Sequence, residues 1–220
     1  MATRSEIISR LIDPGVIAVV RAPNAGLVVP LSEALVQGGV IAIEVTMTTP
    51  NAIEAIRDAS QRLGPRALFG VGTVLNAATC RAAIEAGAEF VVSPITKGEI
   101  VETAHAFDRP VMLGAYTPTE AQLAHELGAD FIKLFPADGL GPSYIKAVRA
   151  PLPHLRIVPT GGVDLHTAAE FIKAGCVALG AGSSLVSSKL LQEENWAELT
   201  RLAKEFVGIV KQARQAKPAA

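Results

Sequence analysis

Short apolar runs alternate with longer amphipathic segments along most of the chain. The short runs are rich in valine and isoleucine and predict strands buried on both faces, whereas the segments between them repeat apolar residues at helical spacing. Eight strands are predicted, at Val16–Arg21, Val40–Thr46, Ala67–Thr73, Glu89–Ser93, Pro110–Ala115, Asp130–Phe135, Arg156–Thr160 and Cys176–Gly180. Helices are predicted at Leu31–Gln37, Asn51–Arg62, Ala77–Ala86, Gly98–Phe107, Thr119–Leu127, Ser143–Arg149, Leu165–Ala174 and Glu194–Ala213, with a short amphipathic helix ahead of the fold at Ser5–Ile12.

Glycine recurs at the ends of the helices that precede the second, fourth, sixth and eighth strands, at Gly39, Gly87, Gly128 and Gly175. Glycine is favoured at the left-handed position that follows a helix, so the recurrence indicates a repeated strand–helix unit. Eight such units with short connections predict parallel strands that close into a (β/α)8 TIM barrel, as a single domain over residues 1–220. The alternative is an open doubly wound sheet, but the segment after the first strand lacks the G-x-G-x-x-G with which such a sheet binds phosphate.

Composition limits the classes of partner. Half of the 220 residues are hydrophobic, 19% are charged and the formal net charge is −1, without a long run of one sign. This balance argues against nucleic acid or an anionic membrane as the partner. The N-terminal residues carry charges throughout and no window is apolar enough for a membrane span, so we expect a cytoplasmic protein. Cys80 and Cys176 stand far apart in apolar segments, which predicts inert thiols in the core.

The run D-F-I-K-L-F-P, from Asp130 to Pro136, places a lysine inside the sixth predicted strand. Side chains alternate along a strand, so Phe131, Lys133 and Phe135 share one face. A lysine is rarely buried without a partner, because removing an ammonium group from water is costly. Burial also favours the neutral amine, which is a nucleophile. Lys133 is therefore either a nucleophile or half of a structural ion pair, and the strand pattern alone does not separate the two.

The same argument applies to Glu44 in the second predicted strand, V-I-A-I-E-V-T. Because it alternates with Ile43 and Val45, it points into the barrel if those two residues pack on helices. One interpretation is a buried salt bridge between Glu44 and Lys133 that only supports the fold. The other is a lysine that forms a Schiff base, with a carboxyl group beside it that moves protons. We favour the second interpretation, because perturbed ionisable pairs gather at functional sites.

TIM barrels carry their chemistry at the C-terminal ends of the strands. In chain order, the residues at these ends are Arg21, Glu44, Thr73, Pro94, Tyr116, Lys133, Thr160-Gly161-Gly162 and Gly182-Ser183. The glycine-rich loops after the seventh and eighth strands let backbone N–H groups approach an anion, and a helix that opens after Gly162 adds a favourable field. We expect these loops to bind phosphate, with ordinary glycine turns as the alternative. Asp164 is interpreted as the cap of that helix, and no two histidines stand at metal-ligand spacing.

Taken together, these motifs resemble one known family, the class I 2-keto-3-deoxy-6-phosphogluconate (KDPG) and 4-hydroxy-2-oxoglutarate (KHG) aldolases. The resemblance runs from about Val16 to Val186. The matching segments, in matching order, are E-V-T at Glu44, G-V-G-T-V-L-N from Gly70 to Asn76, S-P at Ser93, K-L-F-P at Lys133, P-T-G-G-V at Pro159 and G-S at Ser183. The resemblance implies a (β/α)8 barrel, assembled as a homotrimer, that makes pyruvate and an aldehyde from a 2-keto-4-hydroxy acid without a metal or other cofactor.

The resemblance also implies a role for each matching residue. Lys133 is the Schiff-base lysine, whose iminium accepts electrons when the C3–C4 bond breaks, and Glu44 is the general acid and base. Thr73 holds the pyruvate carboxylate, and Arg21 matches an arginine near the substrate. The distal phosphate is bound at the two glycine loops, whose matching residues are Thr160, Gly161, Gly162, Gly182 and Ser183.

The chain departs from the family at three places. Many members carry an arginine four residues after the glutamate, where this chain has Thr48, so carboxylate binding rests on Thr73, Arg21 and backbone donors. Leu113-Gly114 stands where P-G is frequent, and Ile95-Thr96-Lys97 stands where glycine or histidine is common after S-P. The last two departures border the substrate mouth, so they concern the choice of substrate more than the reaction.

The leading hypothesis is a metal-independent lyase that cleaves 2-dehydro-3-deoxy-6-phosphogluconate to pyruvate and glyceraldehyde 3-phosphate. Alternatives of the same class cleave 4-hydroxy-2-oxoglutarate or 2-dehydro-3-deoxy-6-phosphogalactonate. An alternative of another class is a barrel that binds a phosphosugar without aldolase activity. In each case the expected partner is a small molecule, with no role for nucleic acid or a membrane.

Overall fold

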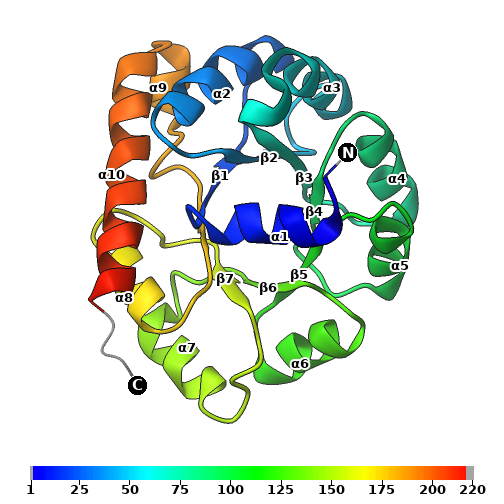
Figure 1. Cartoon of the computed structure of the whole chain (residues 1–220), viewed down its shortest axis with the longest axis vertical. Helices are drawn as coiled ribbons and strands as arrows, with labels where there is room; N and C mark the ends of the chain where they lie inside the picture. The colour runs from blue at the N-terminus through cyan, green and yellow to red at the C-terminus, as the bar shows by residue number, and fades with distance from the viewer. Residues whose placement is uncertain (1, 217–220) are drawn as a thin grey trace.

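A ring of parallel strands surrounded by helices forms a nearly closed barrel (Figure 1). The computed structural model describes residues 2–216. Within them, eight strands pair side by side in the order β7-β6-β5-β4-β3-β2-β1-β8, and a parallel bridge between Thr160 and Gly180 joins the two ends of that order. The predicted (β/α)8 architecture is therefore confirmed. The strands are β1 (Val16–Val20), β2 (Ala42–Thr46), β3 (Leu68–Gly72), β4 (Phe90–Val92), β5 (Val111–Ala115), β6 (Phe131–Leu134), β7 (Ile157–Pro159) and β8 (Leu179–Ala181).

The helices lie outside the strands, apart from the first one. Their bounds are α1 (Arg4–Ile12), α2 (Val28–Gln37), α3 (Ala52–Leu63), α4 (Ala77–Glu85), α5 (Gly98–Ala106), α6 (Pro118–Glu126), α7 (Gly141–Arg149), α8 (Ala168–Lys173), α9 (Ser188–Gln192) and α10 (Trp196–Gln215), with short 3-10 helices η1 (Ala25–Leu27) and η2 (Gly64–Arg66). Most predicted elements are present with ends that differ by a few residues, whereas α9 was not predicted. The largest shifts are of three residues, at the starts of α2 (Val28 instead of Leu31), α8 (Ala168 instead of Leu165) and β8 (Leu179 instead of Cys176).

Alternation along the strands sorts the buried side chains into two clusters. In β6, Ile132 and Leu134 belong to the outer cluster between strands and helices, whereas Phe131 belongs to the cluster inside the barrel. In β2, Ile43 and Val45 likewise pack in the outer cluster. This confirms the prediction that the side chains between them face inward, because successive residues of a strand point to opposite sides.

The four glycines that mark the repeat all adopt the left-handed backbone conformation. Gly39, Gly87, Gly128 and Gly175 have φ values between +89° and +112°. Only glycine enters this region without strain, so each one allows the chain to leave a helix and turn directly into the next strand.

Helix α1 closes the N-terminal end of the barrel, where Figure 1 shows it lying across the ring of strands. Its Ile7 and Leu11 are buried in the inner cluster with Phe90 and Phe131. Burying each of these aliphatic side chains contributes roughly 2 kcal/mol. The helix that was predicted ahead of the fold is therefore part of the barrel, because it fills the end opposite to the strand C-termini.

Candidate functional site

Lys133 and Glu44 face each other inside the barrel. Lys133 lies in β6 and is 4% exposed, and Glu44 lies in β2 and is 2% exposed. The Lys133 Nζ atom is 3.7 Å from Glu44 Oε1. This distance permits an ion pair but exceeds that of a hydrogen bond, so the two groups are neighbours without being locked together.

One oxygen of the Glu44 carboxylate, Oε1, is buried but accepts no hydrogen bond from any group within residues 2–216. Buried polar atoms are nearly always paired, so an orphan acceptor beside an amine indicates a place where another polar group binds. Gly72 of β3 makes room for this carboxylate, because a methyl group at that position would collide with it.

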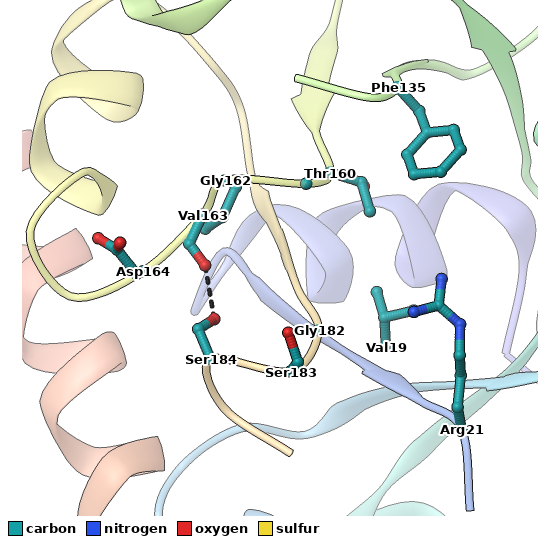
Figure 2. A pocket seen from close by; sticks show the side chains of 11 residues that line it. Val19, Arg21, Phe135, Thr160, Gly162, Val163, Asp164, Gly182, Ser183 and Ser184 are labelled. Atoms are coloured by element: carbon teal, nitrogen blue, oxygen red, sulfur yellow. Dashed lines mark hydrogen bonds between the residues drawn. The ribbon is translucent and has the colours of Figure 1, made fainter. Parts of the chain in front are cut away.

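A cavity of about 300 Å³ opens at the C-terminal ends of β1, β6, β7 and β8, and neither Lys133 nor Glu44 is among the residues that line it. Figure 2 shows Arg21 and Ser183 on one side of it, and Phe135 and Thr160 on the other. Phe135 connects the cavity to the amine, because Lys133 Nζ lies 5.1 Å from the centre of its ring. Of the sequence-predicted site residues, six line this cavity together: Arg21, Thr160, Gly161, Gly162, Gly182 and Ser183.

The loop after β7 is held close to the loop after β6. Gly161 and Gly162 have φ values of +92° and +67°. A side chain at Gly162 would collide with the backbone of Asp138, so only glycine fits there. The Ser184 hydroxyl donates a hydrogen bond to the Val163 carbonyl and joins this loop to the one after β8. The two glycine-rich loops therefore form one continuous wall of the cavity.

The helix that was predicted to open after Gly162 begins later than expected. Residues 165–167 form a turn, and α8 spans only Ala168–Lys173. Asp164 caps that turn, because its Oδ1 accepts hydrogen bonds of 2.8 Å from the backbone N–H groups of His166 and Thr167. Partial burial raises the pKa of Asp164, but these hydrogen bonds outweigh it and lower the pKa below its usual value. An anion at the loop would therefore depend on local N–H and hydroxyl donors, since no helix begins there.

Thr73, like Lys133 and Glu44, does not line the cavity. It follows the end of β3 in the left-handed region, with φ of +62°, and is half-buried. Thr48, at the position where the sequence resemblance would place an arginine, is exposed, and its hydroxyl lies 2.7 Å from that of the buried Thr46. Thr46 in turn donates to the Val20 carbonyl. The rim beside Glu44 thus carries paired hydroxyl groups instead of a second guanidinium.

Sequence reasoning missed five residues that line the cavity, namely Val19, Phe135, Val163, Asp164 and Ser184. Phe135 could have been found, because it shares a strand face with Lys133. Ser184 is one residue beyond the predicted Ser183, and only the fold reveals that its side chain bridges two loops.

Residues 2–216 contain no group of histidine, cysteine and acidic side chains that is suited to hold a metal ion. None of the helices within residues 2–216 is long and apolar enough to cross a bilayer. Cys80 and Cys176 are free and buried, as predicted. Burial raises the pKa of Cys80 to about 11 and that of Cys176 to about 12, so neither thiol is a ready nucleophile.

Comparison with known proteins agrees with this geometry. The model of the family described as KDPG and KHG aldolase matches residues 7–202. A 2-dehydro-3-deoxy-phosphogluconate aldolase of Haemophilus influenzae is 33% identical over 210 residues, which cover 95% of this chain and 99% of that protein.

Two solved structures are similar throughout the barrel. A KDPG aldolase from Legionella pneumophila, with pyruvate captured as a covalent carbinolamine intermediate, has a TM-score of 0.81 at 28% identity over 90% of this chain and 96% of that one. A cube-shaped cage designed by fusing symmetric oligomeric domains has a TM-score of 0.84 at 30% identity, over 91% and 73% of the two chains. With the family model and the relative spanning nearly the whole chain, this protein belongs to the KDPG and KHG aldolase family.

Proposed function

We propose that the protein is a class I aldolase that cleaves 2-dehydro-3-deoxy-6-phosphogluconate to pyruvate and glyceraldehyde 3-phosphate. The observation that carries this proposal is the buried amine of Lys133, 3.7 Å from a carboxylate oxygen that has no hydrogen-bond partner within residues 2–216. A purely structural ion pair would be expected to close into hydrogen bonds, because an unsatisfied buried carboxylate destabilises the fold.

The Lys133 amine attacks the C2 ketone, and the carbinolamine that forms loses water to give an iminium. Glu44 accepts the proton of the 4-hydroxyl group while the C3–C4 bond breaks, and the bonding electrons move into the iminium to give an enamine. The aldehyde leaves, and a proton returned to C3 makes the pyruvyl iminium. Water then releases pyruvate and restores the amine, so Glu44 acts alternately as base and acid.

The cavity supports a phosphorylated substrate. Its wall combines two loops rich in glycine and the Ser183 hydroxyl, which are donors suited to phosphate oxygens. In this proposal Thr160, Gly161, Gly162 and Gly182 hold the phosphate through the backbone. Arg21 and Thr73 are left to hold the carboxylate.

Turnover of a substrate panel tests the proposal. Pyruvate release is measured with the phosphogluconate-derived, phosphogalactonate-derived and unphosphorylated keto acids, in the presence of EDTA. The expected preference is for the first acid, with activity unchanged by the chelator. A preference for 4-hydroxy-2-oxoglutarate or for the galactonate epimer would keep the reaction and replace the substrate. If none of the three is cleaved, the reading as a phosphosugar-binding barrel takes its place.

We also propose that each chain is one barrel domain and that the protein is a cytoplasmic homotrimer. Two free buried thiols suit a reducing compartment. A structure with the same barrel was built from symmetric oligomeric domains, which supports an assembly of copies. Light scattering should give three times the chain mass of 22.9 kDa. A mass of one or two chains would contradict the trimer.

A further inference from the structure

A second cavity opens at the other end of the barrel, where β6 begins. Its volume is about 310 Å³, close to that of the cavity at the strand C-termini. The charged or ionisable side chains that line it are Arg4, His125, Asp130, His154 and Arg156. This volume lies within the range of small-molecule sites, and the proposed cleavage reaction uses none of these residues.

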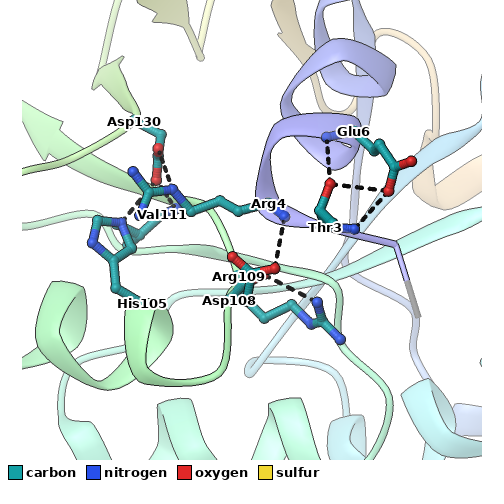
Figure 3. Close-up of polar contacts among 8 residues, drawn as sticks. All are labelled: Thr3, Arg4, Glu6, His105, Asp108, Arg109, Val111 and Asp130. Atoms are coloured by element: carbon teal, nitrogen blue, oxygen red, sulfur yellow. Dashed lines mark hydrogen bonds and ion pairs between the residues drawn. The ribbon is translucent and has the colours of Figure 1, made fainter.

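The carboxylate of the second cavity is already occupied by other groups. Asp130 has a side chain that is 5% exposed, with Oδ1 3.0 Å from Arg4 Nε. Its Oδ2 lies 3.0 Å from His105 Nε2 and accepts the Val111 N–H at 2.9 Å (Figure 3). Asp130 is therefore not available to neutralise the other cations of the cavity.

The remaining cationic and ionisable groups have few partners. Among residues 2–216, no hydrogen bond or ion pair engages the guanidinium of Arg156, and that residue is exposed. The rings of His125 and His154 lie 4.7 Å apart between centroids, and His154 Nε2 is 2.9 Å from Gln122 Oε1. Besides the Arg4–Asp130 pair, one guanidinium and two imidazoles thus surround the space.

The field of a helix C-terminus explains only some of the cationic and ionisable side chains around the second cavity. His125 lies in the last turn of α6, where a positive side chain favours the helix C-terminus. Arg4 is explained by its ion pair with Asp130. Arg156, from the segment before β7, has neither explanation, and a ligand with negative charge would account for its place beside the two histidines.

We propose that this cavity binds a small oxyanion with two or more negative charges, such as a phosphate or a polycarboxylate. Arg156 would provide a planar pair of N–H donors, and Arg4 has further donors besides the Nε that contacts Asp130. Because Arg4 belongs to α1 and Arg156 precedes β7, an anion here joins the N-terminal helix to the barrel wall. Such a ligand would stabilise the folded chain without touching the aldolase site.

The four histidines provide reporters for both cavities. His125 and His154 line the second cavity, whereas His166 donates its N–H to Asp164 at the wall of the first. Ring resonances of the whole protein are followed by NMR during titration with inorganic phosphate and then with citrate, at fixed pH. Sodium chloride serves as the control for ionic strength. We expect saturable shifts of His125 and His154 with both oxyanions and none with chloride.

Two substitutions test whether the anion binds in the second cavity. Arg156→Gln should weaken the binding reported by His125 and His154 by about tenfold, which is typical of losing a charge-assisted contact. Arg57→Gln, on the exposed side of α3, makes the same change in net charge and should leave binding unchanged. Aldol cleavage should be unaffected in both variants, so failure here is distinct from failure of the proposed function.

Three outcomes would contradict the proposal that the second cavity binds an oxyanion. The first is a shift of His166 alone, which would place the only oxyanion at the strand C-termini. The second is an equal response to chloride, which would mean charge screening only. The third is unchanged binding in Arg156→Gln, which would show that the cavity's cations do not hold the anion.

Discussion

Two buried carboxylates, one at each end of the barrel, have opposite surroundings. Asp130, just before β6, has both oxygens engaged by Arg4, His105 and a backbone N–H (Figure 3). Glu44, in β2, has an oxygen with no hydrogen bond within residues 2–216, and its neighbouring amine stays 3.7 Å away. Burial alone therefore does not distinguish a structural carboxylate from a functional one. The difference is whether the surrounding groups satisfy it.

The same β6 segment contributes to both ends. Asp130 holds α1 across the N-terminal end, and three residues later Lys133 lies inside the barrel beside Phe135, which lines the cavity at the C-terminal end. We infer that the first pair stabilises the barrel, whereas the second leaves its polar atoms for a substrate. Substitution of Asp130 should therefore reduce stability more than activity, whereas substitution of Lys133 or Glu44 should reduce activity more than stability.

The largest effect is expected for Lys133→Ala. Removing the proposed nucleophile should lower kcat/KM by roughly 10⁴-fold or more, because in the proposed reaction only this amine forms the iminium. The readout is kcat/KM of the folded protein, because the loss of the cation also leaves the buried Glu44 carboxylate without its partner and lowers the free energy of unfolding. Residual cleavage within tenfold of the parent enzyme would exclude Lys133 as the nucleophile.

Glu44→Gln should cost less activity than loss of the lysine. We expect kcat to fall by about 10²- to 10⁴-fold, because proton transfer loses its acid and base while the amine remains. Stability should change little, since Oε1 gives up no hydrogen bond. Steady-state kinetics and urea unfolding on the same preparation check both statements. A large loss of stability with normal kcat would make the pair structural.

Gly72→Ala tests whether the carboxylate must keep its position. The added methyl group collides with Glu44, so we expect a fall in kcat of about tenfold or more. Gly208→Ala in α10 is the matched control, because nothing lies within 4 Å of the added group and alanine favours a helix. Equal kcat values for the two variants would show that Glu44 tolerates displacement.

Asp130→Ala should show the reverse pattern. It leaves His105 and Arg4 without their carboxylate, and the free energy of unfolding should fall by about 3 kcal/mol. The kcat of the folded fraction should be unchanged. Asp58→Ala, which removes an exposed pair with Arg62, should cost less than about 1 kcal/mol. If Asp130→Ala were as stable as this control, the described division between the two ends would be wrong.

The smallest effect concerns the thiols, which report opening of the barrel. With a pKa of about 11 for Cys80, only about one thiol in a thousand is ionised near pH 8. Cys176, with a pKa of about 12, is less ionised still. Reaction with a disulfide reagent should therefore be very slow in the native protein and faster in Asp130→Ala, but not in Glu44→Gln. Rapid native reaction would contradict the burial of either thiol.

Much of the fold could be predicted from local patterns. Lys133 and Glu44 follow from strand alternation, because a period of two places them opposite the outward-facing isoleucine, leucine and valine. The start of α8 could not be predicted. Leu165–Thr167 fits a helix in sequence, but Asp164 and the Thr167 side chain bind the backbone there and hold a turn.

Contacts between residues that lie far apart in the sequence could not be predicted from local patterns. The network of Arg4, His105 and Asp130 joins three elements far apart in the chain, and no pattern of spacing encodes it. The sequence likewise shows that Lys133 and Glu44 share an interior. It does not contain the 3.7 Å separation or the unpaired oxygen that distinguishes a site from a salt bridge.

Borohydride trapping measures the central claim most directly. The protein is incubated with pyruvate and reductant, digested, and its peptides are analysed by mass spectrometry. We predict one reduced pyruvyl adduct, on the peptide that contains Lys133, and none in Lys133→Ala. No adduct on the wild-type protein, or an adduct confined to exposed lysines, would contradict an amine that condenses with a ketone inside the barrel.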